Sequence, residues 1–107
     1  MEDSKAQILI VDDDKAFRVA TVALLQDEGY AVTAAANAEQ ARKQIDAVRF
    51  DLILSDLVME GMNGIELLQY IKRTAPDATV MMVTGFGSIQ TAVEAMRYGA
   101  YDYLTKP

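Results

Sequence analysis

The sequence predicts an α/β fold in which helices cover both faces of a parallel β-sheet. Five short apolar runs alternate along the chain with four stretches whose apolar residues recur at helical spacing. The first apolar run, Ile8 to Val11, is continuous rather than alternating, which is typical of a strand that is buried on both faces. A chain of 107 residues has room for one domain, so we expect a single domain over residues 1–107.

The first strand and the first helix meet at an acidic run. Ile8 to Val11 is followed by Asp12, Asp13 and Asp14, and the side chain of Asp14 can cap the helix that begins after it. Gly29 is placed to end this helix. Apolar residues at helical spacing form its expected buried stripe: Phe17, Ala20, Leu24 and Leu25.

The second strand is weaker and spans Ala31 to Ala34. Asn37 and Gln40 then have the spacing of a capping box, which predicts a helix start. The expected buried residues of that helix are Ala38, Ala41, Ile45 and Val48. The central strand is expected over residues 50–55, and Asp56 stands at its end before a turn-rich segment at 60–64.

The second half of the chain repeats the alternation. Three apolar residues mark a third helix that ends before Pro76: Ile65, Leu68 and Ile71. A fourth strand over 80–83 ends at Thr84, and Ser88 can cap a fourth helix, which Gly99 ends. The apolar residues of that helix are Ile89, Ala92, Val93 and Met96. A short last strand over 101–104 is followed by Thr105, Lys106 and Pro107.

Polar side chains follow four of the five expected strands. They are Asp12, Asp13 and Asp14 after the first, Asp56 after the third, Thr84 after the fourth and Lys106 after the fifth. Taken singly, each has a structural explanation, since acids favour helix starts and an aspartate, threonine or lysine after a strand is often a turn or surface residue. The carboxyl ends of parallel strands share one edge, where ligands of such sheets bind, so the joint placement favours a site.

Several carboxylates at one edge repel one another unless a cation lies between them. The chain has no His and no Cys, so oxygen ligands remain, and these suit Mg²⁺ with a phosphoryl group as its second partner. The ammonium of Lys106, the hydroxyl of Thr84 and backbone N–H groups could neutralise the phosphoryl oxygens. An aspartate could act as the nucleophile and become an acyl phosphate.

Composition excludes several other kinds of site. The lack of Cys and His rules out disulfides, thiolate zinc sites and Ser-His triads. A net charge of −6 makes direct binding of nucleic acid by this segment unexpected. No apolar run approaches the roughly 20 residues of a membrane span, and no signal-peptide core precedes the first strand, so we expect a cytoplasmic protein with no membrane partner.

Four segments carry a recognisable pattern: Ile8 to Asp14, Asp51 to Met59, Val83 to Gly85, and Lys106 with Pro107. Over essentially its whole length the chain resembles a response-regulator receiver domain. The resemblance implies a flavodoxin-like (CheY-like) three-layer fold with a five-stranded parallel sheet in the order 2-1-3-4-5. It also implies that Asp56 accepts phosphate from a sensor histidine kinase in a Mg²⁺-dependent reaction.

The resemblance assigns roles to individual residues. Asp13, Asp56 and the main-chain carbonyl of Val58 would bind Mg²⁺ directly, and Asp12 would act mainly through water. Lys106 would pair with Asp56 and then with its phosphate. Two further residues would report phosphorylation: Thr84, through a hydrogen bond to the phosphoryl group, and Tyr103, as the coupled aromatic switch.

The chain departs from the family pattern in two places. Family members often carry proline after the methionine that follows the acceptor, whereas Met59 is followed here by Glu60, which leaves that turn without a fixed φ. Family members also continue into a fifth helix after Pro107, so we expect a piece of a longer protein or a truncated one, whose first helix stands alone on one face of the sheet.

Residues 84–88 and 99–104 look like receivers of NtrC-type transcriptional activators, which carry an AAA+ ATPase and a DNA-binding domain. This resemblance implies an output domain or effector protein as partner, regulation of transcription as output, and allows a homodimer. We expect a switch rather than an enzyme. The alternatives are a receiver-like module that binds partners without phosphorylation, and an aspartate-nucleophile phosphohydrolase, which usually needs a second acid where Val58 stands.

Overall fold

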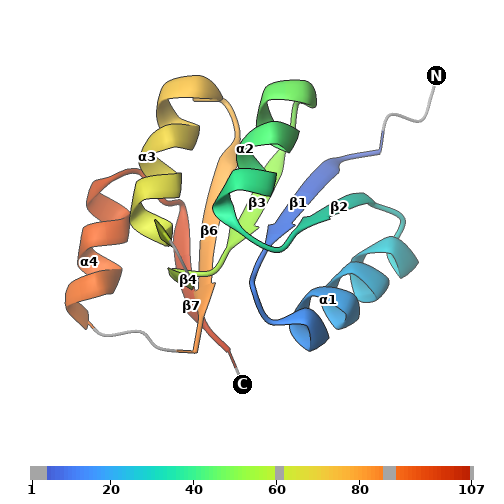
Figure 1. The fold of residues 1–107 in the computed structure, drawn as a ribbon, viewed down its shortest axis with the longest axis horizontal. Helices are drawn as coiled ribbons and strands as arrows, with labels where there is room; N and C mark the ends of the chain where they lie inside the picture. The colour runs from blue at the N-terminus through green and yellow to red at the C-terminus, as the bar shows by residue number, and fades with distance from the viewer. Residues whose placement is uncertain (1–4, 60–61, 86–88, 107) are drawn as a thin grey trace.

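The computed structural model describes residues 5–59, 62–85 and 89–106, which form three layers (Figure 1). The middle layer is a five-stranded parallel sheet in the order β2-β1-β3-β6-β7. Its strands are β1 (Gln7–Val11), β2 (Ala31–Ala35), β3 (Leu52–Ser55), β6 (Thr79–Thr84) and β7 (Asp102–Thr105). When only the strands of this sheet are numbered, β6 is the fourth and β7 the fifth, and the order is 2-1-3-4-5. The predicted strand order and the flavodoxin-like (CheY-like) fold are therefore confirmed.

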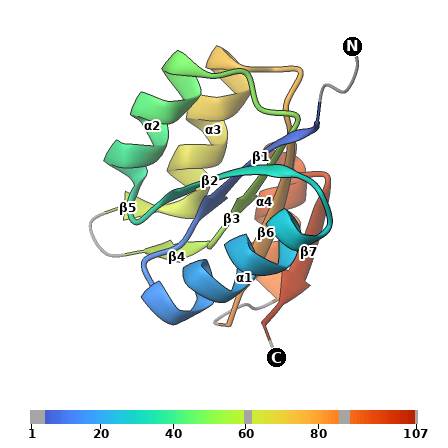
Figure 2. The same cartoon turned by 90° about the vertical axis from the view of Figure 1, so that its right-hand side faces the viewer.

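The helices divide unequally between the two faces of the sheet (Figure 2). Their bounds are α1 (Lys15–Asp27), α2 (Ala38–Ala47), α3 (Gly64–Thr74) and α4 (Ile89–Arg97). One face carries α1 and the opposite face carries α2, α3 and α4, because right-handed crossovers in this strand order place the helices so.

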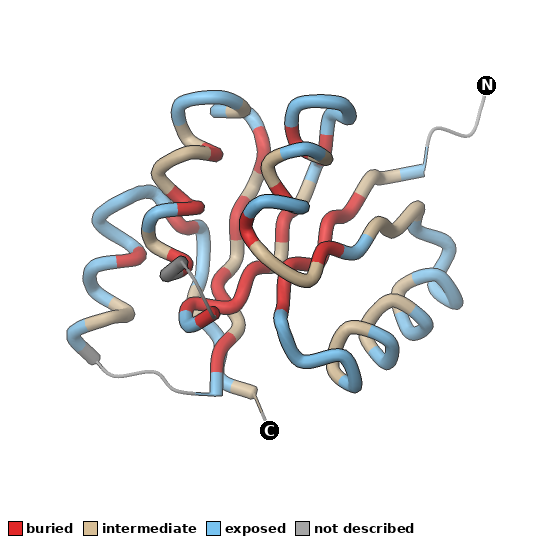
Figure 3. The backbone as a smooth tube through the Cα atoms, in the orientation of Figure 1, coloured by how far each residue is buried: buried red, intermediate tan, exposed pale blue. Residues whose placement is uncertain are grey.

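The hydrophobic core lies between the sheet and the three-helix face. Successive strand residues point to opposite faces, and Leu9, Val11 and Ile53 pack there against apolar side chains of α2 and α3 such as Leu67 and Ile71. Figure 3 shows the buried stretches running along the strands, while α1 is exposed or half-buried throughout. The core of the described structure is thus built mainly on one side of the sheet.

The predicted stripes of two helices are wrong in part. In α1 no residue is buried, and Ala20 and Leu24 are exposed, because this helix packs chiefly over β2 and β1 at one side of the sheet. In α4 the buried residue is Ala95, whereas Val93 and Met96 are exposed. A small residue lets α4 approach its neighbours closely, and the larger apolar residues therefore point outward.

Residues at the ends of the helices behave largely as predicted. The side chains of Asp14 and Asn37 accept the backbone N–H of Phe17 (3.2 Å) and Gln40 (2.8 Å) as helix caps. In a capping box the side chain of Gln40 would accept the backbone N–H of Asn37. It instead accepts the N–H of Ala36, one residue earlier, at 2.8 Å, so the predicted box forms only in part. Gly29 and Gly99 follow the ends of α1 and α4 with φ of 98° and 103°.

Three local expectations have other outcomes. Val48 lies beyond the last turn of α2 and is exposed rather than buried. The expected turn at 60–64 includes part of a short antiparallel ladder, in which β4 (Val58–Met59) pairs with β5 (Met62–Asn63). The predicted cap Ser88 lies outside the described residues.

Among the helices that the structure describes, none has the length and apolar character needed to cross a bilayer.

Candidate phosphoacceptor site

The site is built at the carboxyl edge of the two central strands. Asp12 follows β1 and Asp56 follows β3, and these strands pair in parallel with Val11 opposite Ser55. The backbone N–H of Asp56 donates to the carbonyl of Val11 at 2.9 Å, which fixes the two strand ends relative to each other. Both aspartates are almost fully buried, with 1% and 5% of their surface exposed.

Three carboxylates converge at this edge. One oxygen from each of Asp12, Asp13 and Asp56 lies within 4.8 Å of the other two. Asp13 is exposed, unlike its two partners, so the cluster is open to solvent on one side. The structure thus brings together Asp12 and Asp13, which follow β1, and Asp56, which follows β3.

The start of α1 is tied to the acidic turn. The carboxylate of Asp12 accepts the backbone N–H of Asp14 at 2.9 Å, and the guanidinium of Arg18 donates to the carbonyl of Asp12 at 2.8 Å. Beside Asp56, the backbone N–H of Val58 donates to its Oδ1 at 3.2 Å. The main-chain N–H of Val58 therefore contacts the predicted acceptor, and metal binding by the Val58 carbonyl stays a prediction.

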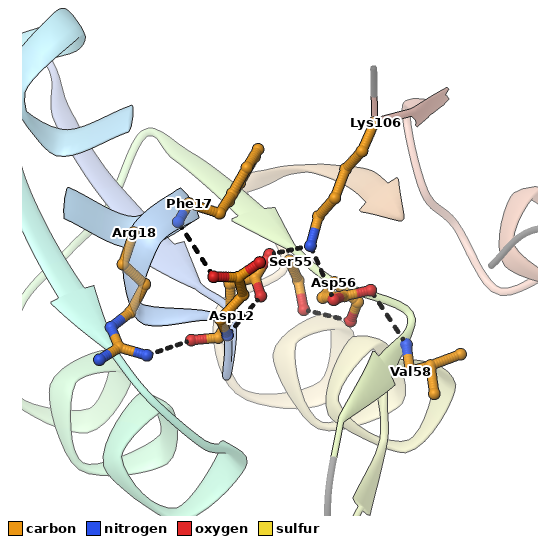
Figure 4. A network of polar contacts seen from close by, with 8 residues as sticks. Asp12, Phe17, Arg18, Ser55, Asp56, Val58 and Lys106 are labelled. Carbon is orange, nitrogen blue, oxygen red and sulfur yellow. Dashed lines mark hydrogen bonds and ion pairs between the residues drawn. The ribbon is translucent and has the colours of Figure 1, made fainter. Parts of the chain in front are cut away.

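Lys106 supplies the positive charge of the site (Figure 4). Its Nζ lies 2.8 Å from Oδ2 of Asp12 and 3.2 Å from Oδ2 of Asp56. Its backbone N–H donates to the carbonyl of Thr84 at 2.9 Å, so the end of β6 positions it. The ammonium also lies 4.5 Å from the centre of the Phe17 ring.

Burial and pairing shift the ionisation of two of these groups. Burial raises the pKa of Asp12 above its usual range, and the hydrogen bond from Lys106 offsets only part of this effect. For Lys106 burial acts to lower the pKa, but hydrogen bonds to Asp12 and Asp56 outweigh it and raise the pKa. Lys106 is therefore charged at neutral pH.

The two predicted switch residues lie in different surroundings. Thr84 is fully buried at the end of β6. Tyr103, on β7, is half-buried and packs against the core. Its hydroxyl lies 3.3 Å from the hydroxyl of Thr91 on α4, so the structure links Tyr103 to that helix.

Gly64, at the start of α3, is a site residue whose role the sequence did not indicate. A Cβ here would overlap the carbonyl oxygen of Asp56 and lie 2.7 Å from Cα of Leu57. Its N–H donates to the carbonyl of Leu57 at 2.6 Å. The only sequence signal is a glycine within a turn-rich segment, and the pattern does not show that α3 packs directly on the acceptor backbone.

We expect Gly64→Ala to lower the free energy of unfolding by about 1–3 kcal/mol, because the acceptor backbone must shift to admit a methyl group. Urea denaturation followed by circular dichroism measures this change. Gly85→Ala is the matched control, since a Cβ there meets nothing closer than the Lys106 side chain at 3.9 Å. Equal stability of the two variants would contradict the close packing at Gly64.

Comparison with known proteins identifies the family of the chain. The family model for the response regulator receiver domain matches residues 8–107. The transcriptional regulatory protein ZraR of Klebsiella oxytoca is 43% identical over 107 residues, which cover 100% of this chain and 24% of that protein. The chain thus spans about a quarter of the length of the curated relatives it matches.

Solved structures show the same fold. A Burkholderia pseudomallei response regulator with a phosphorylated aspartic acid, a calcium ion and citrate is 36% identical, with a TM-score of 0.93 over 96% of this chain and 61% of that one. The beryllofluoride-activated NtrC4 receiver domain dimer is 37% identical, with a TM-score of 0.89 over 94% and 84% of the two chains. The chain therefore belongs to the response regulator receiver domain family, and its relatives include NtrC-type transcriptional activators.

Proposed function

We propose that this domain is the phosphoacceptor switch of a two-component system, in which a sensor histidine kinase phosphorylates Asp56. The observation that carries the proposal is the position of Asp56. It is buried, lies 3.2 Å from the Lys106 ammonium, and shares an oxygen cluster with Asp12 and Asp13. A carboxylate in this setting can act as a nucleophile because a fixed cation can neutralise the charge that it acquires.

The donor set suits Mg²⁺. Oxygens on opposite sides of an ion with bonds of 2.0–2.1 Å lie about 4.2 Å apart, so three oxygens within 4.8 Å of one another can converge on one ion with small side-chain adjustments. Asp13, Asp56 and the carbonyl of Val58 would hold the ion, and Asp12 would act through water. Bound there, Mg²⁺ would offset the negative charge of the phosphoryl oxygens.

In the proposed transfer, one carboxylate oxygen of Asp56 forms a bond to phosphorus while the bond from phosphorus to the imidazole nitrogen of the kinase breaks. The electron pair of that bond stays on the nitrogen. The Lys106 ammonium pairs with the new phosphoryl group, and the hydroxyl of Thr84 donates to one of its oxygens. The product adds roughly 1.5 to 2 negative charges to a site that is already acidic.

The phosphoryl group acts on the output by favouring one of two conformations of the domain. Thr84 and Tyr103 would carry this change, the first through its bond to the phosphoryl group and the second through its contact with α4. An output domain or effector would read the altered face, and relatives that are transcriptional regulators support transcription as the output. The NtrC4 receiver dimer supports a homodimer as the activated form.

Intact-mass spectrometry after incubation with acetyl phosphate and Mg²⁺ tests the proposal. We expect one phosphate adduct on the wild-type chain and on Asp77→Asn, an exposed aspartate distant in sequence from the cluster, and no adduct on Asp56→Asn. An adduct that persists in Asp56→Asn would overturn the assignment. Continuous release of phosphate from a phosphomonoester would instead indicate a phosphohydrolase.

A further inference from the structure

An aromatic ring lies against the cation of the phosphoacceptor site. The Lys106 Nζ is 4.5 Å from the centre of the Phe17 ring, within the range of an attractive cation–π contact. The same nitrogen contacts Asp12 and Asp56 at 2.8 and 3.2 Å. The ammonium thus contacts two carboxylates and one ring, which come from the start of α1 and the ends of β1 and β3 (Figure 4).

The core does not explain an aromatic residue at position 17. Phe17 is half-buried, α1 has no buried residue, and the core cluster lies on the opposite face of the sheet without Phe17. A leucine would satisfy the apolar pattern of α1 equally well. What distinguishes phenylalanine here is the π face that contacts the Lys106 ammonium.

The backbone of Phe17 is held by the acidic turn itself. Asp14 accepts the backbone N–H of Phe17 at 3.2 Å, and the N–H of Asp14 donates to the carboxylate of Asp12 at 2.9 Å. Arg18, the next residue, donates to the Asp12 carbonyl at 2.8 Å. The turn that holds Asp12 in the site therefore also holds the backbone of Phe17, from which the ring reaches Lys106.

We propose that Phe17 is a positioning residue for phosphoryl transfer, which holds the Lys106 ammonium beside Asp56. This inference rests on the proposed function of Asp56. A lysine ammonium is a strongly hydrated charge on a flexible stem of four carbons, so it occupies several positions unless its surroundings confine it. The ring attracts the ammonium and excludes water from part of its surface, which leaves it oriented for the incoming phosphoryl oxygens.

Two substitutions separate the π face from simple apolar cover. Phe17→Leu keeps an apolar side chain and removes the ring, whereas Phe17→Tyr keeps the ring. With saturating Mg²⁺ and acetyl phosphate, we expect Phe17→Leu to slow formation of the adduct by about threefold to tenfold. Phe17→Tyr is expected to stay within about twofold of wild type. Urea denaturation should show a loss of at most about 1 kcal/mol for Phe17→Leu, which is the size of the contact itself and leaves the domain folded.

A spectroscopic signal checks the contact without phosphorylation. A ring shifts the NMR signals of protons above its face upfield, so the Lys106 Hε protons are expected upfield in wild type and Phe17→Tyr and near ordinary values in Phe17→Leu. Lys106→Met identifies the signal by its loss. An ordinary shift in wild type would overturn the proposed contact.

The outcomes of the rate experiment distinguish the two proposals. Equal rates for wild type, Phe17→Leu and Phe17→Tyr would overturn the role of Phe17 and leave the acceptor role of Asp56 standing. Equal slowing of both variants would also overturn it, because the ring itself would then not matter. Failure of all three proteins to take up phosphate would instead overturn the proposed function, and the role of Phe17 with it.

Discussion

Replacing Lys106 with methionine is expected to lower the free energy of unfolding by about 2–4 kcal/mol, because it leaves two buried carboxylates without their cation. Asp12 is 1% exposed and its Oδ2 lies 2.8 Å from the ammonium. Methionine has similar length and fills the same space, so the loss reflects charge rather than a cavity. Urea denaturation at neutral pH measures the change.

The control for this variant is Lys43→Met on α2, where the lysine is exposed and the expected change is within about 0.5 kcal/mol. The double variant Asp12→Asn with Lys106→Met is expected to recover much of the lost stability, since a neutral amide does not need the cation. Equal stability of Lys106→Met and Lys43→Met would show that Lys106 does not neutralise the buried acids.

The stability of Lys106→Met is also expected to depend on pH with a definite sign. Burial raises the folded-state pKa of Asp12 above its value in the unfolded chain, so the folded state binds this proton more tightly. The stability that this proton contributes is fully present at a pH below the pKa of Asp12 in the unfolded chain. It is lost as the pH rises through the pKa of Asp12 in the folded state. Without Lys106, whose hydrogen bond lowers that pKa, the variant should gain stability on mild acidification more steeply than wild type.

The convergence of Asp12, Asp56 and Lys106 follows from the sequence because the three residues end separate apolar runs. Parallel strands place such ends along one edge, and this rule needs no knowledge of side-chain contacts. The strand order followed from a resemblance to a known family. Both expectations rest on features that extend over many residues, and both agree with the structure.

The contacts of Phe17 and Ala95 could not be predicted in the same way. Helical periodicity shows which residues share a face, but it does not show what lies opposite that face. Phe17 therefore looked like a core residue, although its ring meets an ammonium. Alanine is small and only weakly hydrophobic, so the apolar pattern of α4 pointed to the larger Val93 and Met96 as its buried residues. In the structure both are exposed and Ala95 is buried.

The hairpin of β4 and β5 was missed for a different reason. Each strand has two residues, which is too short for alternation to appear in the sequence. The close approach of Gly64 to Asp56 depends on that local path of the chain, so it was missed as well.

Addition of Mg²⁺ is expected to raise the midpoint of thermal unfolding, because an ion that binds the folded acidic cluster stabilises it by mass action. At a Mg²⁺ concentration ten times its dissociation constant the gain is about 1.4 kcal/mol, which corresponds to roughly 6–10 °C for a domain of this size. Differential scanning calorimetry measures the shift. Removing the ion with a chelator should reverse it.

Two substitutions of exposed aspartates separate site binding from general screening of charge. Asp13→Asn replaces a carboxylate of the proposed metal site with a neutral amide and should abolish most of the Mg²⁺-dependent shift, whereas Asp77→Asn removes the same charge elsewhere and should retain it. Because both residues are exposed, neither change should disturb the core. An equal shift in both variants, or an equal shift on adding KCl of the same ionic strength, would mean that the ion acts through screening and not at the three acids.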